Sequence, residues 1–186
     1  MAIRKIARMG HPVLRTSAEL VADPTAPEIR CLVEDMLETL AEERGTGLAA
    51  LQVFVSQRVV VFFVARGEEQ VPLTVLINPV VEPLGPEMSL AYEGCLSLPG
   101  LTGRVPRFER IEYIGLDLSG QRVARTATGF HARVVQHECD HLDGVLYPMR
   151  MTDPGTFGFA EEIHRAVHDE RLPLTPPGDP AREGIP

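Results

Sequence analysis

Residues 136–144 read Gln136-His137-Glu138-Cys139-Asp140-His141-Leu142-Asp143-Gly144, and this stretch contains the motif H-E-x-x-H. Residues four apart lie on one face of a helix, so His137 and His141 can bind one metal ion together. Glu138 lies beside the first ligand, where a carboxylate can accept a proton from a water on the metal. An ordinary amphipathic helix with two chance histidines would give the same pattern. A third ligand elsewhere in the chain must therefore decide between the two interpretations.

The helix that carries this motif is predicted to begin near Thr128 and to end at Gly144. Phe130 and Val134 precede His137 by seven and three positions, so they share its metal-facing side. We expect them to wall an apolar substrate pocket; the alternative is that both are plain core residues. Cys139 is two positions from each histidine, roughly 200° around the helix, so it cannot join their face. It should pack inward instead.

The composition is that of a soluble globular protein. The chain has 186 residues, 44% of them hydrophobic and 24% charged, and its formal net charge is −8. That charge argues against a broad surface for nucleic acid or an anionic membrane, because both partners require basic patches. No apolar run approaches the ~20 residues that span a bilayer, and the N-terminus lacks the apolar segment of a secretory signal. Three cysteines make no disulfide framework, so we expect a reducing, cytoplasmic location.

Upstream of the motif, the pattern predicts an irregular arm over residues 1–24 and then a long helix. The T-x-x-E pattern from Thr25 to Glu28 is a capping-box signature, and Gly45 is a natural stop for the helix. Apolar residues recur between them at helical spacing: Ile29, Leu32, Val33, Met36, Leu37 and Leu40. Cys31 falls within this helix and is expected to be a small buried side chain.

β-branched apolar runs predict strands over residues 59–65 and 73–84. Residues 104–118 and 121–127 predict a hairpin that turns at Ser119-Gly120. No βαβ rhythm is present, so the predicted fold class is α+β, with mainly antiparallel sheets around the central helix that carries H-E-x-x-H.

A last helix is predicted over residues 156–171. It contains His164 and His168 at ligand spacing, but Arg165 stands where the base should be, which favours a solvated helix face. We expect one catalytic domain over residues 1–171. The Pro-rich residues 172–186 should form a disordered tail.

The stretch from Gly45 to Gln52 reads Gly-Thr-Gly-Leu-Ala-Ala-Leu-Gln. Glycines two positions apart, followed by small residues, indicate backbone that another group must approach closely. A phosphate loop is excluded, because G-x-x-x-x-G-K is absent and no strand leads into the stretch. The alternative is a helix end that runs into a buried turn. Near a catalytic metal, Gln52 would be a good amide donor.

Three candidates compete for the third metal ligand. One metallopeptidase class continues H-E-x-x-H with x-x-G-x-x-H, but Tyr147 occupies the position of that histidine. In the His₂Glu zinc peptidases a glutamate on a following helix completes the site, and Glu161 fits that arrangement. The thiolate of Cys95, in a turn-flanked stretch, would instead give a His₂Cys site with one open position. The residues alone leave Glu161 and Cys95 open.

Three separate motifs give the chain a resemblance to the peptide deformylases. In the order of that family they are residues 45–52, Glu93-Gly94-Cys95-Leu96-Ser97 and residues 136–141. Shorter matches at residues 10–15 and 105–107 extend the likeness from near the N-terminus to about Met151. The resemblance implies a metal-dependent hydrolase that removes the N-terminal formyl group from the formylmethionine of newly synthesised proteins.

The resemblance also implies roles for individual residues. The implied metal ligands are Cys95, His137 and His141. The implied catalytic groups are the Glu138 carboxylate as general base, and the Gln52 amide and Leu96 backbone N–H as oxyanion donors. The implied substrate-binding residues fall into groups. Thr46 and Gly47 would pair with the peptide as an added strand, and Phe130 and Val134 would receive the methionine side chain. Glu93 is also implied to bind substrate. Asp140 is expected to orient a ligand or an arginine.

The implied cofactor is one divalent metal ion. The ligand types alone suggest zinc, whereas the family implies ferrous iron, with zinc, nickel or cobalt able to occupy the site. The implied partners are N-formylmethionyl nascent peptides and, transiently, the ribosome; no membrane and no sequence-specific nucleic acid are expected. Thr46 departs from the family, where Ile or Val is usual. The last helix and the tail match nothing firm in the family, so ribosome docking by the C-terminus has no support in the residues.

Overall fold

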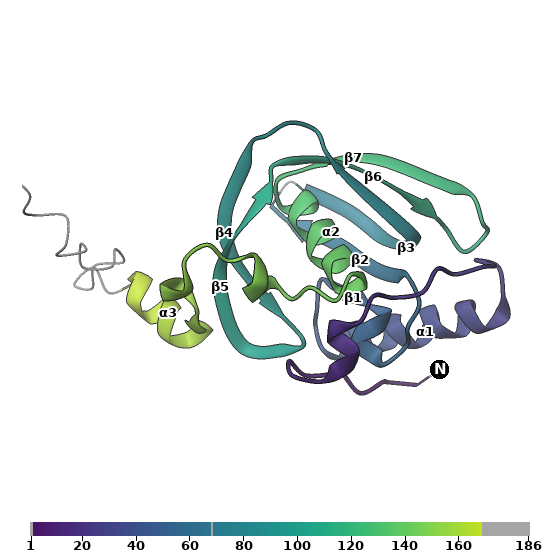
Figure 1. Cartoon of the computed structure of the whole chain (residues 1–186), viewed down its shortest axis with the longest axis horizontal. Helices are drawn as coiled ribbons and strands as arrows, with labels where there is room; N and C mark the ends of the chain where they lie inside the picture. Colours follow the sequence, from purple (N-terminus) through teal and green to yellow (C-terminus); the bar gives the residue numbers. More distant parts are fainter. Residues whose placement is uncertain (1, 68, 169–186) are drawn as a thin grey trace, which may run out of the picture.

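The computed structural model describes residues 2–67 and 69–168, and it places one helix between two antiparallel sheets (Figure 1). The central helix α2 (Gly129–Leu142) carries the H-E-x-x-H motif. The larger sheet has the strand order β1 (Gly47–Ala49), β2 (Val59–Arg66), β3 (Glu69–Pro83), β6 (Arg110–Leu116) and β7 (Arg122–Thr128). The smaller sheet has the order β4 (Met88–Cys95), β5 (Leu98–Phe108) and β8 (Gly158–Phe159). The predicted α+β class is confirmed.

The larger sheet separates two hydrophobic cores, because successive side chains of β2 point to opposite faces. Val60, Phe62 and Val64 belong to the core that the sheet shares with α2. Val59 and Val61 belong to the core beneath helix α1 (Pro27–Glu42). A strand that is covered on both faces is apolar at nearly every position, which explains the continuous apolar run from residue 59.

Helix α1 confirms the predicted apolar stripe but not the predicted start. It begins at Pro27, with Ala26 as its N-cap and no side-chain cap. The predicted capping box is therefore wrong: the helix starts one residue too late for Thr25, whose hydroxyl donates to the Asp23 carboxylate instead. The prediction for Cys31 is also wrong, because this thiol is exposed. Its position lies on the side of the helix opposite the buried stripe.

β4 and β5 form a long hairpin whose tip holds Cys95, paired with Leu98 after a register shift. The sequence pattern did not predict β4, and it merged the end of β5 with β6 into one strand over residues 104–118. The two strands in fact separate at Glu109. The hairpin of β6 and β7 is confirmed. The Asp117 carboxylate holds its turn by accepting the backbone N–H of Ser119.

The remaining segments are short. The N-terminal arm is irregular, as predicted, apart from one turn of 3₁₀ helix. The 3₁₀ helices are η1 (Pro12–Arg15), η2 (Ala50–Val53), η3 (Tyr147–Arg150) and η4 (Pro154–Thr156). Helix α3 (Ala160–His168) begins four residues later than predicted. Within the described ranges, no helix is both long enough and apolar enough to cross a membrane. The predicted domain end at residue 171 and the predicted tail lie outside the described residues.

Candidate metal centre and substrate pocket

Helix α2 buries charged and polar side chains along most of its length. His137, Glu138 and His141 are 9%, 5% and 2% exposed. The two imidazole rings meet edge to face with their centroids 5.1 Å apart, as the four-residue spacing predicts. The helix ends at Leu142, and Gly144 follows two residues later with a φ of 71°, in the left-handed region that favours glycine. Burying such polar groups is costly unless each has a partner, so their partners define the site.

Cys95 joins the two histidines from the tip of the β4–β5 hairpin. The ligand atoms of Cys95, His137 and His141 all lie within 4.8 Å of one another, and Cys95 Sγ is 3.3 Å from His141 Nε2. The backbone N–H of Ser97 lies 3.4 Å from the same sulfur and donates to it. The structure thus brings together the three predicted metal ligands from two elements. Glu161, the rival third ligand, is exposed on α3 and is not part of this group.

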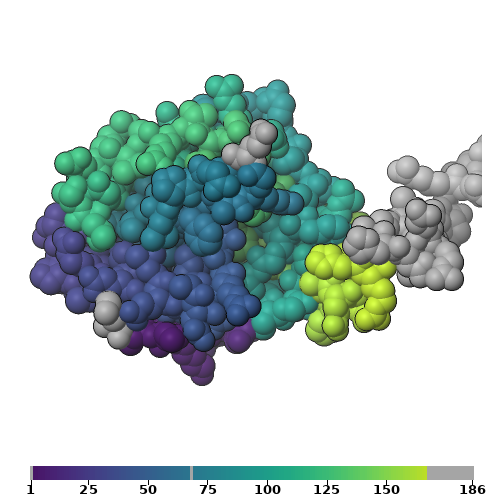
Figure 2. Space-filling model, turned by 180° about the vertical axis from the view of Figure 1, so that it is seen from behind, coloured from purple at the N-terminus to yellow at the C-terminus, as the bar shows by residue number. Residues whose placement is uncertain are grey.

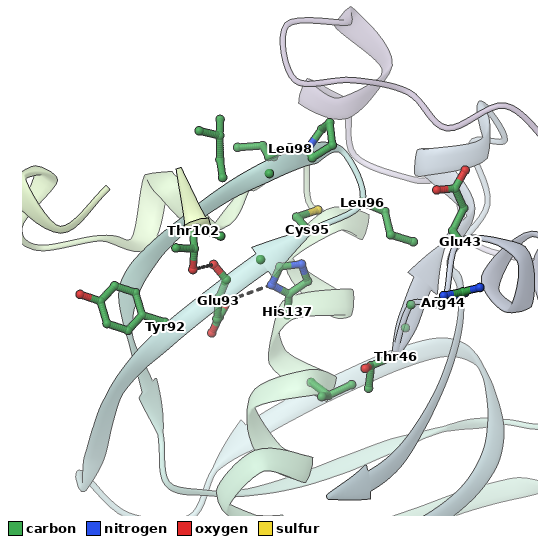
Figure 3. Close-up of a pocket in the computed structure, with 18 of the residues that line it drawn as sticks. Glu43, Arg44, Thr46, Tyr92, Glu93, Cys95, Leu96, Leu98, Thr102 and His137 are labelled. Carbon is green, nitrogen blue, oxygen red and sulfur yellow. Dashed lines mark hydrogen bonds and ion pairs between the residues drawn. The ribbon is translucent and has the colours of Figure 1, made fainter. Parts of the chain in front are cut away.

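Glu93 fixes the orientation of His137, as Figure 3 shows. Its Oε2 lies 2.8 Å from His137 Nδ1, so the other ring nitrogen is left for the ligand group. Arg107 donates two hydrogen bonds to the Glu93 carboxylate, at 2.9 and 3.0 Å, and Arg133 donates a third at 2.8 Å. Burial alone would raise the pKa of Glu93, but the hydrogen bonds from His137 and Arg107 outweigh it and lower this pKa to about 2. Glu93 is therefore an ionised carboxylate behind the site.

The charge network continues away from the site through Arg107. Arg107 also donates to Asp140, and Arg150 donates to the other oxygen of that carboxylate at 2.7 Å. Asp140 thus contacts two arginines, in line with its expected role. Burial lowers the pKa of His141, and the nearby charges of His137 and Arg107 lower it further. A neutral His141 is the form that a metal ion binds.

Glu138 is a buried carboxylate with an unused oxygen. Its Oε2 has no hydrogen-bond partner among the described residues. Burial raises its pKa to about 7, and the charge of Glu93 acts in the same direction against the opposing charge of His137. Its Oε1 packs so closely on Gly47 that a Cβ there would overlap it. This contact bears out the prediction that another group approaches the glycine-containing backbone closely.

Gln52 is held in one orientation by its own 3₁₀ turn. Its Oε1 accepts the backbone N–H of Ala49 at 2.8 Å, so its amide nitrogen must face the site. That nitrogen donates to Ser97 Oγ at 3.2 Å and lies 3.5 Å from Cys95 Sγ. A fixed N–H donor beside the ligand group is suited to stabilise a developing negative charge.

The site opens into one cavity of about 620 Å³. Ten of the eleven residues assigned from the sequence line it: Thr46, Gly47, Gln52, Glu93, Cys95, Leu96, Phe130, Val134, His137 and Glu138. His141 belongs to the ligand group behind them. Phe130 and Val134 stand on α2 one turn apart, and a cavity of this size is in the range of small-molecule sites.

Sequence reasoning missed two parts of the site. The first is Arg133, whose guanidinium is buried on Glu93; its spacing of four residues before His137 was an available signal. The second is His164, which was expected on a solvated helix face. It is exposed as expected, but it also lines the cavity. The pairing of β8 with β5, far apart in sequence, helps to bring it there.

Comparison with known proteins gives this site its family. A sequence profile described as polypeptide deformylase matches residues 3–156. The chain belongs to the polypeptide deformylase family. Peptide deformylase 1 of Nitrosomonas europaea is 49% identical over 166 residues, which cover 87% of this chain and 94% of that relative. Peptide deformylase 1 of Bordetella pertussis is 51% identical over the same length and the same shares of both chains.

A solved structure agrees with this deformylase assignment. The Met-Ala-Ser-bound class I type b peptide deformylase from Acinetobacter baumannii is 33% identical, with a TM-score of 0.77, over 81% of this chain and 99% of that one. The predicted family, fold and function are thereby confirmed. This deformylase is a hydrolase that removes the N-terminal formyl group from newly synthesised proteins, in a family of metalloenzymes.

Proposed function

We propose that Cys95, His137 and His141 bind the catalytic metal ion of this deformylase. One thiolate and two imidazoles whose donor atoms lie within 4.8 Å of one another fit a single divalent ion with an open coordination position. His141 is neutral and Glu93 holds the far nitrogen of His137, so both rings present a nitrogen to the same point. This convergence is the observation that carries the proposal.

Glu138 is the proposed general base and acid. When bound, a divalent ion supplies Lewis-acid chemistry, because it lowers the pKa of a coordinated water towards ~7 and polarises a carbonyl. Glu138 takes a proton from the attacking water on its unpartnered Oε2 as the water oxygen bonds to the formyl carbon. The carbon–nitrogen bond then breaks, and Glu138 returns the proton to the departing amine. Formate and a free N-terminus result.

Gln52 and Leu96 are the proposed oxyanion donors. The Gln52 amide nitrogen is aimed into the site by the Ala49 hydrogen bond, and Leu96 adjoins the ligand Cys95 on the cavity wall. A donor of this kind is worth roughly 3–4 kcal/mol of transition-state stabilisation.

The substrate is proposed to lie along β1. This strand pairs with β2 on one side, so the backbone of Thr46 and Gly47 has its other edge available to a peptide strand. Phe130 and Val134 receive the methionine side chain, whose flexible thioether suits an apolar slot. The Glu93 carboxylate is occupied by its arginines and His137, so substrate contact by this residue falls to its backbone in β4.

The family assignment supports proposals for the ion, the partners and the location. We propose ferrous iron in the cell, with zinc, nickel or cobalt able to occupy the site, since a His₂Cys set by itself also suits zinc. The substrates are N-formylmethionyl nascent peptides. We therefore place the enzyme in the cytoplasm, where it meets the ribosome transiently.

Formate release from formyl-Met-Ala-Ser by anaerobically purified, Fe(II)-loaded protein tests the activity. Metal content tests the ligands: Cys95→Ala should lose the ion, whereas Glu161→Ala, the matched change at the rival ligand, should retain it. Retained metal in the first variant and loss in the second would overturn the ligand assignment. No formate with Fe(II), Ni(II) or Co(II) loaded would defeat the catalytic proposal.

A further inference from the structure

The C-terminal end of the described chain forms one wall of the substrate pocket. The family profile ends at residue 156, before β8 and α3 begin. Ala160 and His164 of α3 nevertheless line the same cavity as Cys95 and Glu138. This wall therefore lies outside the region that the family profile defines. Figure 2 shows α3, in yellow, at the edge of the molecule against the teal strands.

β8 attaches this wall directly to the pocket. Gly158 pairs with Thr102 and Phe159 with Leu101, and both of these β5 residues line the cavity. Thr102 in turn donates its hydroxyl to the backbone oxygen of Glu93 at 2.8 Å. In Figure 3 the yellow-green C-terminal ribbon accordingly runs beside Thr102. A short run of backbone pairing thus joins α3 to the residue that orients His137.

The spacing of the cavity-lining residues defines which face of α3 lies against the cavity. Ala160 and His164 are one turn apart and share a face. Ile163 is half-buried and packs towards Gly158, so it holds the helix on β8. Arg165 points elsewhere, because it is exposed and pairs with Glu162 of the same helix. Among the side chains of α3 that the structure describes, His164 is therefore the polar one that lines the pocket.

The cavity extends to both sides of His137. It extends from Glu43 and Arg44 at one end to Tyr92 and Thr102 near α3 at the other, with His137 between them (Figure 3). If the methionine side chain occupies the slot at Phe130 and Val134, the later residues of an extended peptide must lie along the cavity walls. Each such residue adds about 3.3 Å to the length of the peptide. An imidazole can donate to a peptide carbonyl or accept from a peptide N–H.

We propose that His164 contacts the formylated peptide beyond its methionine and is a specificity-determining residue for longer substrates. The proposal rests on the placement of the methionine given above. In this arrangement α3 binds the backbone of the nascent chain beyond the methionine. The enzyme then distinguishes substrates by their length and by the path of their third and later residues.

The test compares two substrates on the metal-loaded full chain: formyl-Met-Ala and formyl-Met-Ala-Ser-Ala-Gly. His164→Ala should raise KM for the longer peptide about three- to tenfold, the effect of one lost hydrogen bond, and leave its kcat and all constants for the short peptide unchanged. His164→Gln should retain most of the wild-type KM. Arg165→Ala, on the outer face of the same helix, is the matched control and should behave as wild type. Equal effects of His164→Ala on both peptides, or none on either, would overturn the proposal.

A binding measurement separates this proposal from the catalytic one. Calorimetric titration with the deformylated peptides Met-Ala and Met-Ala-Ser-Ala-Gly requires no turnover. If His164→Ala binds the longer peptide more weakly but the shorter one normally, the result supports the contact between His164 and the peptide, even if formate release fails. Unchanged binding of both peptides by that variant contradicts it, even in a fully active enzyme.

Discussion

At the scale of single residues, Glu138 carries the sharpest prediction. Its buried Oε2 has no partner among the described residues, which supports its proposed role as proton carrier, so Glu138→Gln should lower kcat for formyl-Met-Ala-Ser by about 10²–10⁴-fold. The amide keeps the shape of the side chain, and metal content should not change. Glu161→Gln, an exposed carboxylate on α3, is the control and should leave kcat unaltered. A Glu138→Gln enzyme with near-normal formate release would remove Glu138 from the mechanism.

Glu93 has a different role, because its carboxylate touches arginines and a ligand histidine at once. Glu93→Gln leaves Arg107 and Arg133 with a neutral partner in a buried site, and we expect the free energy of unfolding to fall by about 3 kcal/mol. His137 also loses the charge that orients it, so metal affinity should fall about 10- to 100-fold. Urea denaturation and competition with a chelator measure the two effects.

The control for this change is Glu34→Gln, which alters an exposed carboxylate of α1. It should change neither stability nor metal affinity. A Glu93→Gln protein as stable as this control would show that the arginines find other partners.

At the scale of elements, the sequence pattern predicted the strands and helices whose formation depends on neighbouring residues. The run of apolar residues from Val59 marks a strand covered on both faces, and the spacing of His137 and His141 fixes their common face. β4 escaped prediction because Gly94, Pro99 and later glycines interrupt the strand pattern of its hairpin with β5.

The site likewise has parts that the sequence predicted and parts that it did not. The proposed ligands and base rest on three motifs and their resemblance to a family. The spacing of Arg133 from His137 indicates its face of the helix. Its salt bridge to Glu93 and the pocket position of His164, however, depend on contacts between segments tens of residues apart, which spacing along the chain does not encode.

A further prediction concerns β1, because its backbone lies against the carboxylate of Glu138, the proposed base. A methyl group at Gly47 would overlap Glu138 Oε1, so Gly47→Ala must displace the proposed base or the strand that binds the peptide. A displacement near 1 Å costs about 100-fold in rate, and we expect that loss in kcat/KM for formyl-Met-Ala. Gly158→Ala is the matched strand substitution, since its methyl would make ordinary contact with Ile163. Equal activity of the two variants would contradict the close packing of Glu138 on β1.

At the scale of the whole molecule, the metal group joins two parts of the fold. Cys95 comes from the smaller sheet, whereas His137 and His141 come from the helix that packs on the larger one. An ion held by all three therefore cross-links the sheets, and it stabilises the folded state because the unfolded chain does not preform the site. The proposed ion would thus couple the stability of the two sheets to its three ligands.

Metal removal should consequently lower the melting temperature. With free ion at 100 times its dissociation constant, binding adds about 2.7 kcal/mol, which corresponds to a shift of roughly 5–11 °C for a chain of this size. Scanning calorimetry of the Ni(II)-loaded and chelator-treated protein measures the difference. Cys95→Ser should abolish the shift, because the thiolate is the smaller sheet's contribution to the ligand group. Cys31→Ser, which alters an exposed thiol on α1, should preserve it. A metal-dependent shift that survives in Cys95→Ser would mean that the ion does not tie the two sheets together.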